Sequence, residues 1–171
     1  MLLKKQGFPE ESELVLCTVT SVQYHSVFVD IDEYGKSGLI HISEVSPGRI
    51  RNIRDFVREG KKVVCKVLRI NQEKGYIDLS LRRVNESEKR RKINEIKKEQ
   101  TAEKVIEIAA GKIGIKTEDL YRELSEKIIS YGSLHAFFEE AVKDESVLES
   151  LATDKKHLKI KRIKRMITRF R

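Results

Sequence analysis

Two ring-bearing residues and a run of arginines are the side chains best suited to contact a nucleic acid. In an alternating strand pattern Phe28 and His41 both point outward, and four arginines follow within a short stretch: Arg49, Arg51, Arg54 and Arg58. An exposed ring can stack on any base, which contributes roughly 1–3 kcal/mol per base, while nearby cations contact phosphates without reading sequence. This combination predicts an RNA-binding surface.

Further cations extend the predicted surface, but acidic residues lie among them. Further positive charge comes from Lys62, Lys74, Arg82 and Arg83, whereas the acidic side chains are Asp55, Glu59 and Glu73. Two interpretations of the cations therefore stay open, phosphate contact and ordinary solvated surface. For Phe28 the alternative to base stacking is packing beneath a loop or against another domain.

Residue types and spacings typical of a catalytic centre are missing, so we expect no enzyme, no cofactor and no metal site. The glycines of AAGKIG at 109–114 lie inside a helical pattern, without a preceding strand and without the Ser or Thr that would bind magnesium. Cys17 and Cys65 have no neighbouring Cys or His at metal-ligand spacing. They are either buried small hydrophobic residues or partners in a disulfide.

The net charge of +8 is concentrated at one end of the chain. Residues 155–171 hold nine Lys and Arg and no acidic residue, whereas residues 85–154 hold 12 cationic and 16 acidic side chains. A basic tail alone is weak evidence for specific recognition, because like-charged termini are often solvated arms. No apolar run approaches the roughly 20 residues that cross a bilayer. The first residues lack the apolar stretch of a secretory signal, so we expect a cytoplasmic protein without membrane contact.

Residues 13–83 show an apolar pattern of period two, which predicts a small all-β unit. Its five segments are 13–22, 26–32, 38–43, 61–70 and 75–83. Between the third and the fourth, Ile50, Ile53 and Val57 recur at helical spacing, so a short helix is expected there. Five strands with one helical excursion describe an OB-fold barrel.

After residue 84 the apolar pattern changes to a helical period. Thr117 and Ser133 are predicted as helix N-caps, Gly132 as a helix stop, and Asp144 as the start of a short last helix. We therefore expect an all-β plus all-α protein of two domains, with a barrel at 1–84 and a small helical domain at 85–154. A basic tail follows at 155–171, with its apolar residues on one face of an amphipathic helix.

The blocks VFVDI, GLIHISEV and RINQEKGYIDLSLRRV together resemble the S1 RNA-binding domain. The segments ISEVSPGRIRNIRDFVREG and SLHAFFEEAV, and the continuation of KGYIDLSLRRV into a charged helix, resemble the alpha subunit of archaeal and eukaryotic translation initiation factor 2. This resemblance covers residues 8–153. It implies an S1-type barrel followed by a helical domain, in a non-catalytic, RNA-binding part of a heterotrimer.

The heterotrimer of that family delivers initiator methionyl-tRNA to the small ribosomal subunit. The resemblance therefore implies RNA as a partner, whether ribosomal RNA, messenger or initiator tRNA, together with the beta and gamma subunits. In the family the contact with gamma is made by a third domain, whose start the residues after 154 do not resemble. A missing or altered third domain is the expectation.

The same resemblance assigns roles to particular residues. Phe28 and His41 occupy RNA-binding positions of the S1 domain, and His25, with Tyr24 beside it, stands where the family has its first aromatic residue. Ser46 aligns with the serine that is phosphorylated in eukaryotic members, so it is a candidate regulatory phosphosite. A phosphate on Ser46 would lie near Arg49 and Arg51, and the alternative is an ordinary loop serine.

Two other functions fit the sequence. In one, the acidic helical domain is a docking surface and the chain acts as a protein-interaction scaffold. In the other, the barrel is the accessory S1 module of an RNA-processing complex. RNA binding by the barrel itself, as opposed to the basic tail, distinguishes the first of these alternatives from the initiation-factor hypothesis.

Overall fold

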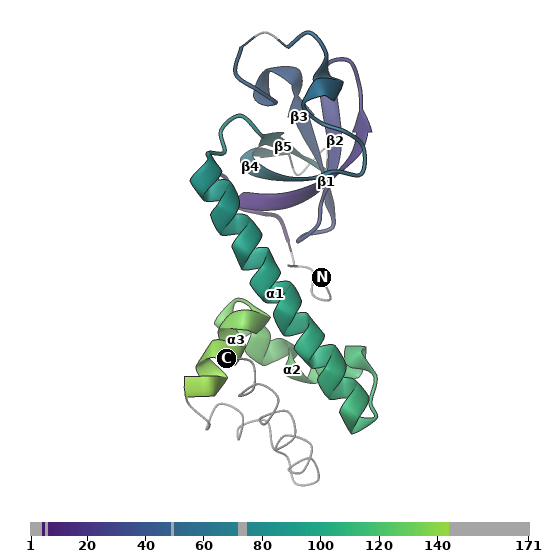
Figure 1. Ribbon diagram of the computed structural model, residues 1–171, viewed down its shortest axis with the longest axis vertical. Helices are drawn as coiled ribbons and strands as arrows, with labels where there is room; N and C mark the ends of the chain where they lie inside the picture. The colour runs from purple at the N-terminus through teal and green to yellow at the C-terminus, as the bar shows by residue number, and fades with distance from the viewer. Residues whose placement is uncertain (1–4, 6, 49, 72–74, 144–171) are drawn as a thin grey trace. The chain divides into compact units, whose positions relative to one another are not determined.

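Five strands close into a barrel in the computed structural model, which describes residues 5, 7–48, 50–71 and 75–143 (Figure 1). They are β1 (Leu14–Val22), β2 (Ser26–Ile31), β3 (Lys36–His41), β4 (Lys62–Asn71) and β5 (Tyr76–Ser80). Neighbours follow the order β1-β2-β3-β5-β4 around the closed barrel, and the pair of β3 with β5 is parallel. This topology confirms the predicted five-stranded OB-fold.

The inward residues of the barrel follow the period-two pattern of the sequence. Side chains from all five strands fill the interior and are almost without solvent exposure: Val15, Cys17, Val19, Val27, Val29, Ile31, Ile40, Cys65, Val67, Ile77 and Leu79. At Gly38, where β3 meets β5, an added Cβ atom would stand 2.5 Å from Cδ1 of Leu79. The missing side chain therefore allows the two strands to approach closely and complete the barrel.

Both cysteines are buried and free. β1 and β4 are antiparallel, and the register pairs Val15 with Cys65 and Cys17 with Val63, so the two cysteines are diagonal neighbours. Diagonal neighbours lie roughly 7–8 Å apart, beyond the usual Cα separation of a disulfide. Hydrogen bonding to Cys65, together with burial, raises the pKa of the Cys17 thiol. Of the two interpretations of these residues, the structure supports buried small side chains.

The segment between β3 and β4 forms two 3₁₀ turns, η1 (Ile42–Glu44) and η2 (Ile53–Asp55), where the sequence predicted one short helix. Ile53 and Val57 do enter the barrel core, as their spacing indicated. The helix is short because the Asn52 side chain accepts the Arg54 N–H at 3.1 Å and starts a new turn, while Gly60, with φ of 78°, reverses the chain soon after.

The first turns of helix α1 (Glu86–Ile113) are fixed to the barrel by a buried ion pair. The Lys92 ammonium lies 2.7 Å from the carboxylate of Glu33, which follows β2, and the side chains are only 5% and 2% exposed. Glu33 also accepts the backbone N–H of Leu16 at 3.0 Å. One buried carboxylate thus joins α1 to the β2–β3 turn and to β1.

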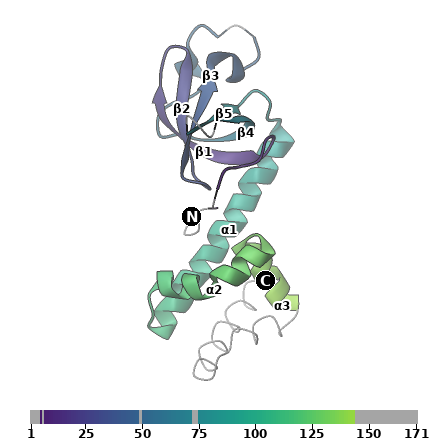
Figure 2. The same cartoon turned by 180° about the vertical axis from the view of Figure 1, so that it is seen from behind.

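Two more helices follow, α2 (Thr117–Tyr131) and α3 (Leu134–Lys143), in the helical part of the chain seen in Figures 1 and 2. Ser133 caps α3 as predicted, because its hydroxyl accepts the Ala136 N–H at 3.1 Å, and Gly132 ends α2 in the left-handed region. The N-cap of α2 is Lys116, so the prediction of Thr117 was wrong by one residue. Lys116 has the extended backbone of a cap, and Thr117 is already helical.

The chain divides into two compact units between Glu95 and Ile96, within α1, whereas the predicted boundary at residue 84 lies at the start of that helix. The interior of the second unit includes Ile106, Leu124, Leu134 and Phe137. None of the helices in the described part of the chain has the length and apolar character to span a membrane. The short last helix predicted from Asp144 and the amphipathic tail lie outside the described residues.

Candidate nucleic-acid interface

A row of four side chains crosses the outward face of four neighbouring strands. Phe28 on β2 is paired with Leu39 on β3. Leu39 is paired in turn with Asp78 on β5, and Asp78 with Arg69 on β4. Phe28 is 39% exposed, so its ring is open to stacking. The row therefore places an exposed aromatic ring, a carboxylate and a guanidinium group on one surface, and these are the groups that can stack on a base, accept from base amino groups and contact a phosphate.

Arg69 joins this row because of a β-bulge in β4. The register against β5 shifts between Val67 and Arg69, so that Val67 is paired with Leu79 and Arg69 with Asp78. Strict alternation from Val67 would have turned residue 69 into the barrel. Arg69 and Asp78 are not among the site residues predicted from the sequence. The available signal was the guanidinium itself, which does not fit a closed apolar interior.

His41 ends β3 on the same face, and its Nδ1 atom is engaged by the residue two positions further on. Its Nδ1 atom accepts the backbone N–H of Ser43 at 3.3 Å and lies 2.8 Å from the Ser43 hydroxyl. A neutral imidazole whose Nδ1 is an acceptor carries its proton on Nε2. The exposed ring of His41 therefore presents an N–H donor to solvent, beside its β2 partner Ser26.

The β1–β2 turn brings Tyr24 and His25 to this end of the sheet. The Gln23 N–H donates to the Ser26 carbonyl at 2.8 Å and closes the turn, while the His25 carbonyl accepts the Ile42 N–H at 2.8 Å. The Tyr24 ring is 80% exposed and stands edge-on to the His25 ring, with centroids 4.5 Å apart. The predicted residues Tyr24, His25 and His41 thus lie on adjoining segments.

The arginine-rich segment between β3 and β4 contacts the end of β1, near the β1–β2 turn. Nη2 of Arg54 donates to the Val22 carbonyl at 3.2 Å, and the Val22 N–H donates to the Glu59 carboxylate at 3.2 Å. Side chains from η2 and the residues after it therefore satisfy both backbone groups at the end of β1. Arg51 is exposed. The predicted residues Arg49 and Lys74 lie outside the described residues.

Arg82 and Arg83 are held by Glu44 of η1. Nε and Nη2 of Arg83 each donate to the Glu44 carboxylate at 3.1 Å, and Nη2 of Arg82 lies 3.9 Å from it. Hydrogen bonding from Arg83 lowers the pKa of the Glu44 carboxyl below its ordinary value. These two predicted RNA-binding residues lie in the chain segment after β5, and a bidentate pair already engages the guanidinium of Arg83.

Ser46 lies in the loop after η1 and is half-buried. Its hydroxyl donates to the Pro47 carbonyl at 3.5 Å. The loop continues through Pro47 and Gly48, the latter with φ of 90°. Modification of Ser46 stays a prediction.

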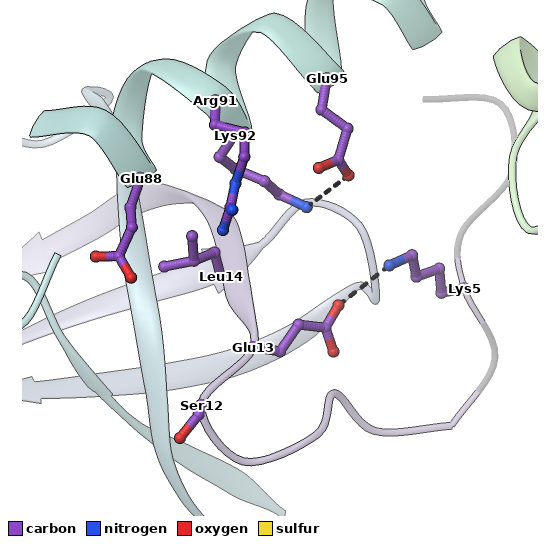
Figure 3. A pocket seen from close by; sticks show the side chains of 8 residues that line it. All are labelled: Lys5, Ser12, Glu13, Leu14, Glu88, Arg91, Lys92 and Glu95. Carbon is purple, nitrogen blue, oxygen red and sulfur yellow. Dashed lines mark hydrogen bonds and ion pairs between the residues drawn. The ribbon is translucent and has the colours of Figure 1, made fainter. Parts of the chain in front are cut away.

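A cavity of about 340 Å³ lies between the N-terminal segment, β1 and the first turns of α1, as Figure 3 shows. Its lining holds three cationic and three acidic side chains, and two pairs lie close together: Lys5 is 3.1 Å from Glu13, and Lys92 is 3.0 Å from Glu95. Because these charges compensate one another, the cavity is less suited to an anionic RNA backbone than the strand face. In the described part of the chain, His, Cys, Asp and Glu side chains form no group of three that could hold a metal.

Residues 9–82 match the family model described as the S1 RNA binding domain. The matched range includes all four residues of the outward row (Phe28, Leu39, Asp78 and Arg69) and the segment between β3 and β4. The sequence resemblance to S1 domains is confirmed.

Curated relatives match most of this chain. It is 46% identical to translation initiation factor 2 subunit alpha of Methanopyrus kandleri over 144 residues, which are 83% of this chain and 54% of that protein. It is 45% identical to the same subunit of Thermococcus gammatolerans over 154 residues, which are 88% of this chain and 56% of that protein. The chain therefore spans about half the length of the curated relatives it matches.

Two solved structures are similar in fold and sequence. The crystal structure of an a/eIF2alpha–aDim2p–rRNA complex from Pyrococcus horikoshii contains a chain 38% identical to this one, with a TM-score of 0.81, covering 96% of this chain and 98% of that chain. The intact alpha subunit of aIF2 from Pyrococcus abyssi is also 38% identical, with a TM-score of 0.84, covering 95% of this chain and 62% of that one.

Proposed function

Because the chain belongs to the family of translation initiation factor 2 alpha subunits, we propose that it is a non-catalytic, RNA-binding part of that factor. The observation that carries the proposal is the outward row of Phe28, Asp78 and Arg69 on a barrel of the S1 type. Three side chains of the row match different parts of a nucleotide: Phe28 the base face, Asp78 the base edge and Arg69 the phosphate.

The geometry favours an unpaired strand over a duplex. A base can stack on Phe28 only if its face is free, and β2 and β3 present a strand surface, not a helix that would enter a groove. The Nε2–H of His41 then donates to a base or sugar oxygen, and Arg69 contacts a phosphate. Tyr24 and His25 extend this contact along the β1–β2 turn.

The proposed partners are RNA and the rest of the factor. The Pyrococcus horikoshii complex contains rRNA together with the alpha subunit and aDim2p, which supports ribosomal RNA as one ligand class for this chain. We further propose that the chain works with the beta and gamma subunits to deliver initiator methionyl-tRNA to the small ribosomal subunit in the cytoplasm. Support for this part is the identity of 43–46% to relatives named as alpha subunits.

Titration of the full chain with a labelled, unstructured oligoribonucleotide tests the barrel as the RNA reader. Phe28→Ala should weaken binding by roughly 1–3 kcal/mol, the value of one stacked base. A matched control is Ile129→Ala, which removes an apolar side chain of 67% exposure from α2 and should leave affinity unchanged. If Phe28→Ala has no effect and a chain ending at residue 154 no longer binds, the basic tail is the RNA-binding element and the proposal is wrong.

A further inference from the structure

Phe56 is an exposed aromatic ring on a rigid support. It follows η2 directly and is 46% exposed. Ile53, three residues earlier, and Val57, the next residue, are 4% and 1% exposed and packed in the barrel core. The N–H groups of Phe56 and Val57 both donate to the Ile53 carbonyl, at 3.1 and 3.2 Å. The backbone is therefore fixed, and the ring is held outward.

The ring of Phe56 is not covered by a cation, unlike the rings of Tyr34 and Phe8 in the same unit. Among the described residues, a lysine ammonium lies 5.4 Å from the ring centroid of Tyr34 and 4.9 Å from that of Phe8. No such cation covers Phe56 in the described part of the chain, although Arg54 and Arg58 are close in sequence. A base could therefore reach the ring without displacing a bound cation.

Both acidic side chains near Phe56, Asp55 and Glu59, are exposed but accept hydrogen bonds within the barrel unit. Asp55 accepts a hydrogen bond from the Asn52 amide at 3.3 Å, and Glu59 accepts the Val22 N–H at 3.2 Å. Arg51 and Arg58 are exposed. An exposed ring flanked by solvent-facing guanidinium groups is complementary to a nucleic-acid strand, which carries one anionic phosphate for each stacking base.

We propose that Phe56 is a second base-stacking position, at which an unpaired base of an RNA strand stacks while Arg51 and Arg58 contact the adjoining phosphates. The Arg54–Val22 hydrogen bond joins η2 to the end of β1, two residues before Tyr24. We therefore expect the RNA strand to pass from the β1–β2 turn to Phe56. This inference rests on the proposed function, because it extends the same strand beyond the Phe28 row. The ligand is single-stranded RNA long enough to contact both rings.

The absence of tryptophan from the sequence allows a position-specific test. Phe56→Trp and Phe28→Trp each create a single fluorescent reporter in the full chain. Both are titrated with an oligouridylate of about 12 nucleotides, within the range of about 4–16 covered by one OB-fold, and with an abasic strand of equal length. Stacking should quench both reporters at the same oligouridylate concentrations, and the abasic strand should quench neither.

Two further variants measure the contribution of the ring. Phe56→Leu retains apolar volume without a ring and should weaken oligouridylate binding about tenfold, whereas Phe56→Tyr should bind within about twofold of the unmodified chain. Because the ring is exposed, both variants should unfold at the urea concentration of the unmodified chain.

The outcomes separate this inference from the proposed function. Quenching in the Phe28→Trp chain without quenching in the Phe56→Trp chain would overturn the second stacking position and leave the first intact. A response from neither reporter would overturn both. If polyglutamate quenches the Phe56→Trp reporter as strongly as oligouridylate does, the Phe56 surface binds acidic protein segments, and the inference is wrong.

Discussion

The ammonium group of Lys92 lies 2.7 Å from the carboxylate of Glu33, and both side chains are buried. Removing one partner of a buried pair typically costs about 3–5 kcal/mol, and in Glu33→Gln the Lys92 ammonium would keep only the largely exposed carboxylate of Glu95, 3.0 Å away. Glu33→Gln retains an acceptor for the Leu16 N–H but removes the charge, so it isolates the ion pair. We expect Glu33→Gln to lower the free energy of unfolding by about that amount in urea denaturation.

The double variant Glu33→Gln, Lys92→Met should cost less than the sum of the single changes, because neither charge is then buried alone. Lys89→Met is the control: Lys89 lies 3.4 Å from Glu86, but both side chains are largely exposed, so the loss should be at most about 1 kcal/mol. If Lys89→Met and Lys92→Met lowered the free energy of unfolding equally, burial of the Lys92–Glu33 pair would not explain its contribution.

Gly38 and Gly111 should respond to alanine in opposite directions. At Gly38 the new Cβ would meet Leu79 at 2.5 Å and Val29 at 3.2 Å, so Gly38→Ala should destabilise the barrel by about 1–3 kcal/mol. Gly111 lies within α1 with nothing near a new Cβ, so Gly111→Ala should stabilise the chain by about 0.5–1 kcal/mol. Thermal denaturation of the two variants compares them directly, and a stable Gly38→Ala chain would show that Leu79 can move aside.

Arg69 and Arg83 should differ in their effect on the salt dependence of RNA binding. Arg69 belongs to the outward row, so Arg69→Gln should reduce the slope of log affinity against log salt by about one. The guanidinium of Arg83 is bonded to Glu44, so Arg83→Gln should leave the slope nearly unchanged. Affinities measured at several salt concentrations give both slopes. A larger change for Arg83→Gln would mean that RNA displaces Glu44.

The contact between Glu44, in the segment between β3 and β4, and Arg83, after β5, should weaken at acidic pH. Hydrogen bonding from Arg83 lowers the pKa of Glu44 in the folded chain, so the stabilisation is present above the ordinary pKa of 4.5 and is lost as the pH falls through the folded value. The contribution is small, because Arg83 is exposed to solvent. In a carboxyl titration followed by NMR, Arg83→Gln should move the Glu44 midpoint upward. An unchanged midpoint would show that Arg83 does not hold the carboxylate in solution.

The sequence predicted what depends on local periodicity. Val27, Val29 and Ile31 alternate with outward residues, and this alternation is enough to identify a strand and its buried face. Ser133 and Gly132 were recognisable because helix caps depend on residue types within one turn. The outward orientation of Phe28 and His41 was predicted for the same reason, whereas their role in RNA binding came from the resemblance to S1 domains and stays a prediction.

What the sequence did not show depends on pairings between distant segments. Asp78 joins the row of Phe28 only because β5 pairs with β3 in parallel, and Arg69 only because a bulge shifts β4 by one residue. Lys92 looked like one of many solvated helix cations, since nothing near it in the sequence indicates the buried carboxylate of Glu33. Closure of the barrel determines all three positions, and a local pattern does not contain that information.

The hydroxyl of Tyr121 is buried and, among the residues that the structure describes, has no hydrogen-bond partner. Burial raises its pKa, and the charges of Glu103 and Glu99 add to the effect. An unsatisfied buried hydroxyl costs about 1–3 kcal/mol, so Tyr121→Phe should leave stability unchanged or raise it. Tyr34→Phe is the matched control, because the Tyr34 hydroxyl donates to both oxygens of Glu13 at 2.8 and 2.9 Å, and its removal should cost about 1.5–3 kcal/mol. In urea denaturation the midpoint should therefore fall for Tyr34→Phe and stay or rise for Tyr121→Phe. A lower midpoint for Tyr121→Phe would mean that the Tyr121 hydroxyl finds a hydrogen-bond partner in solution.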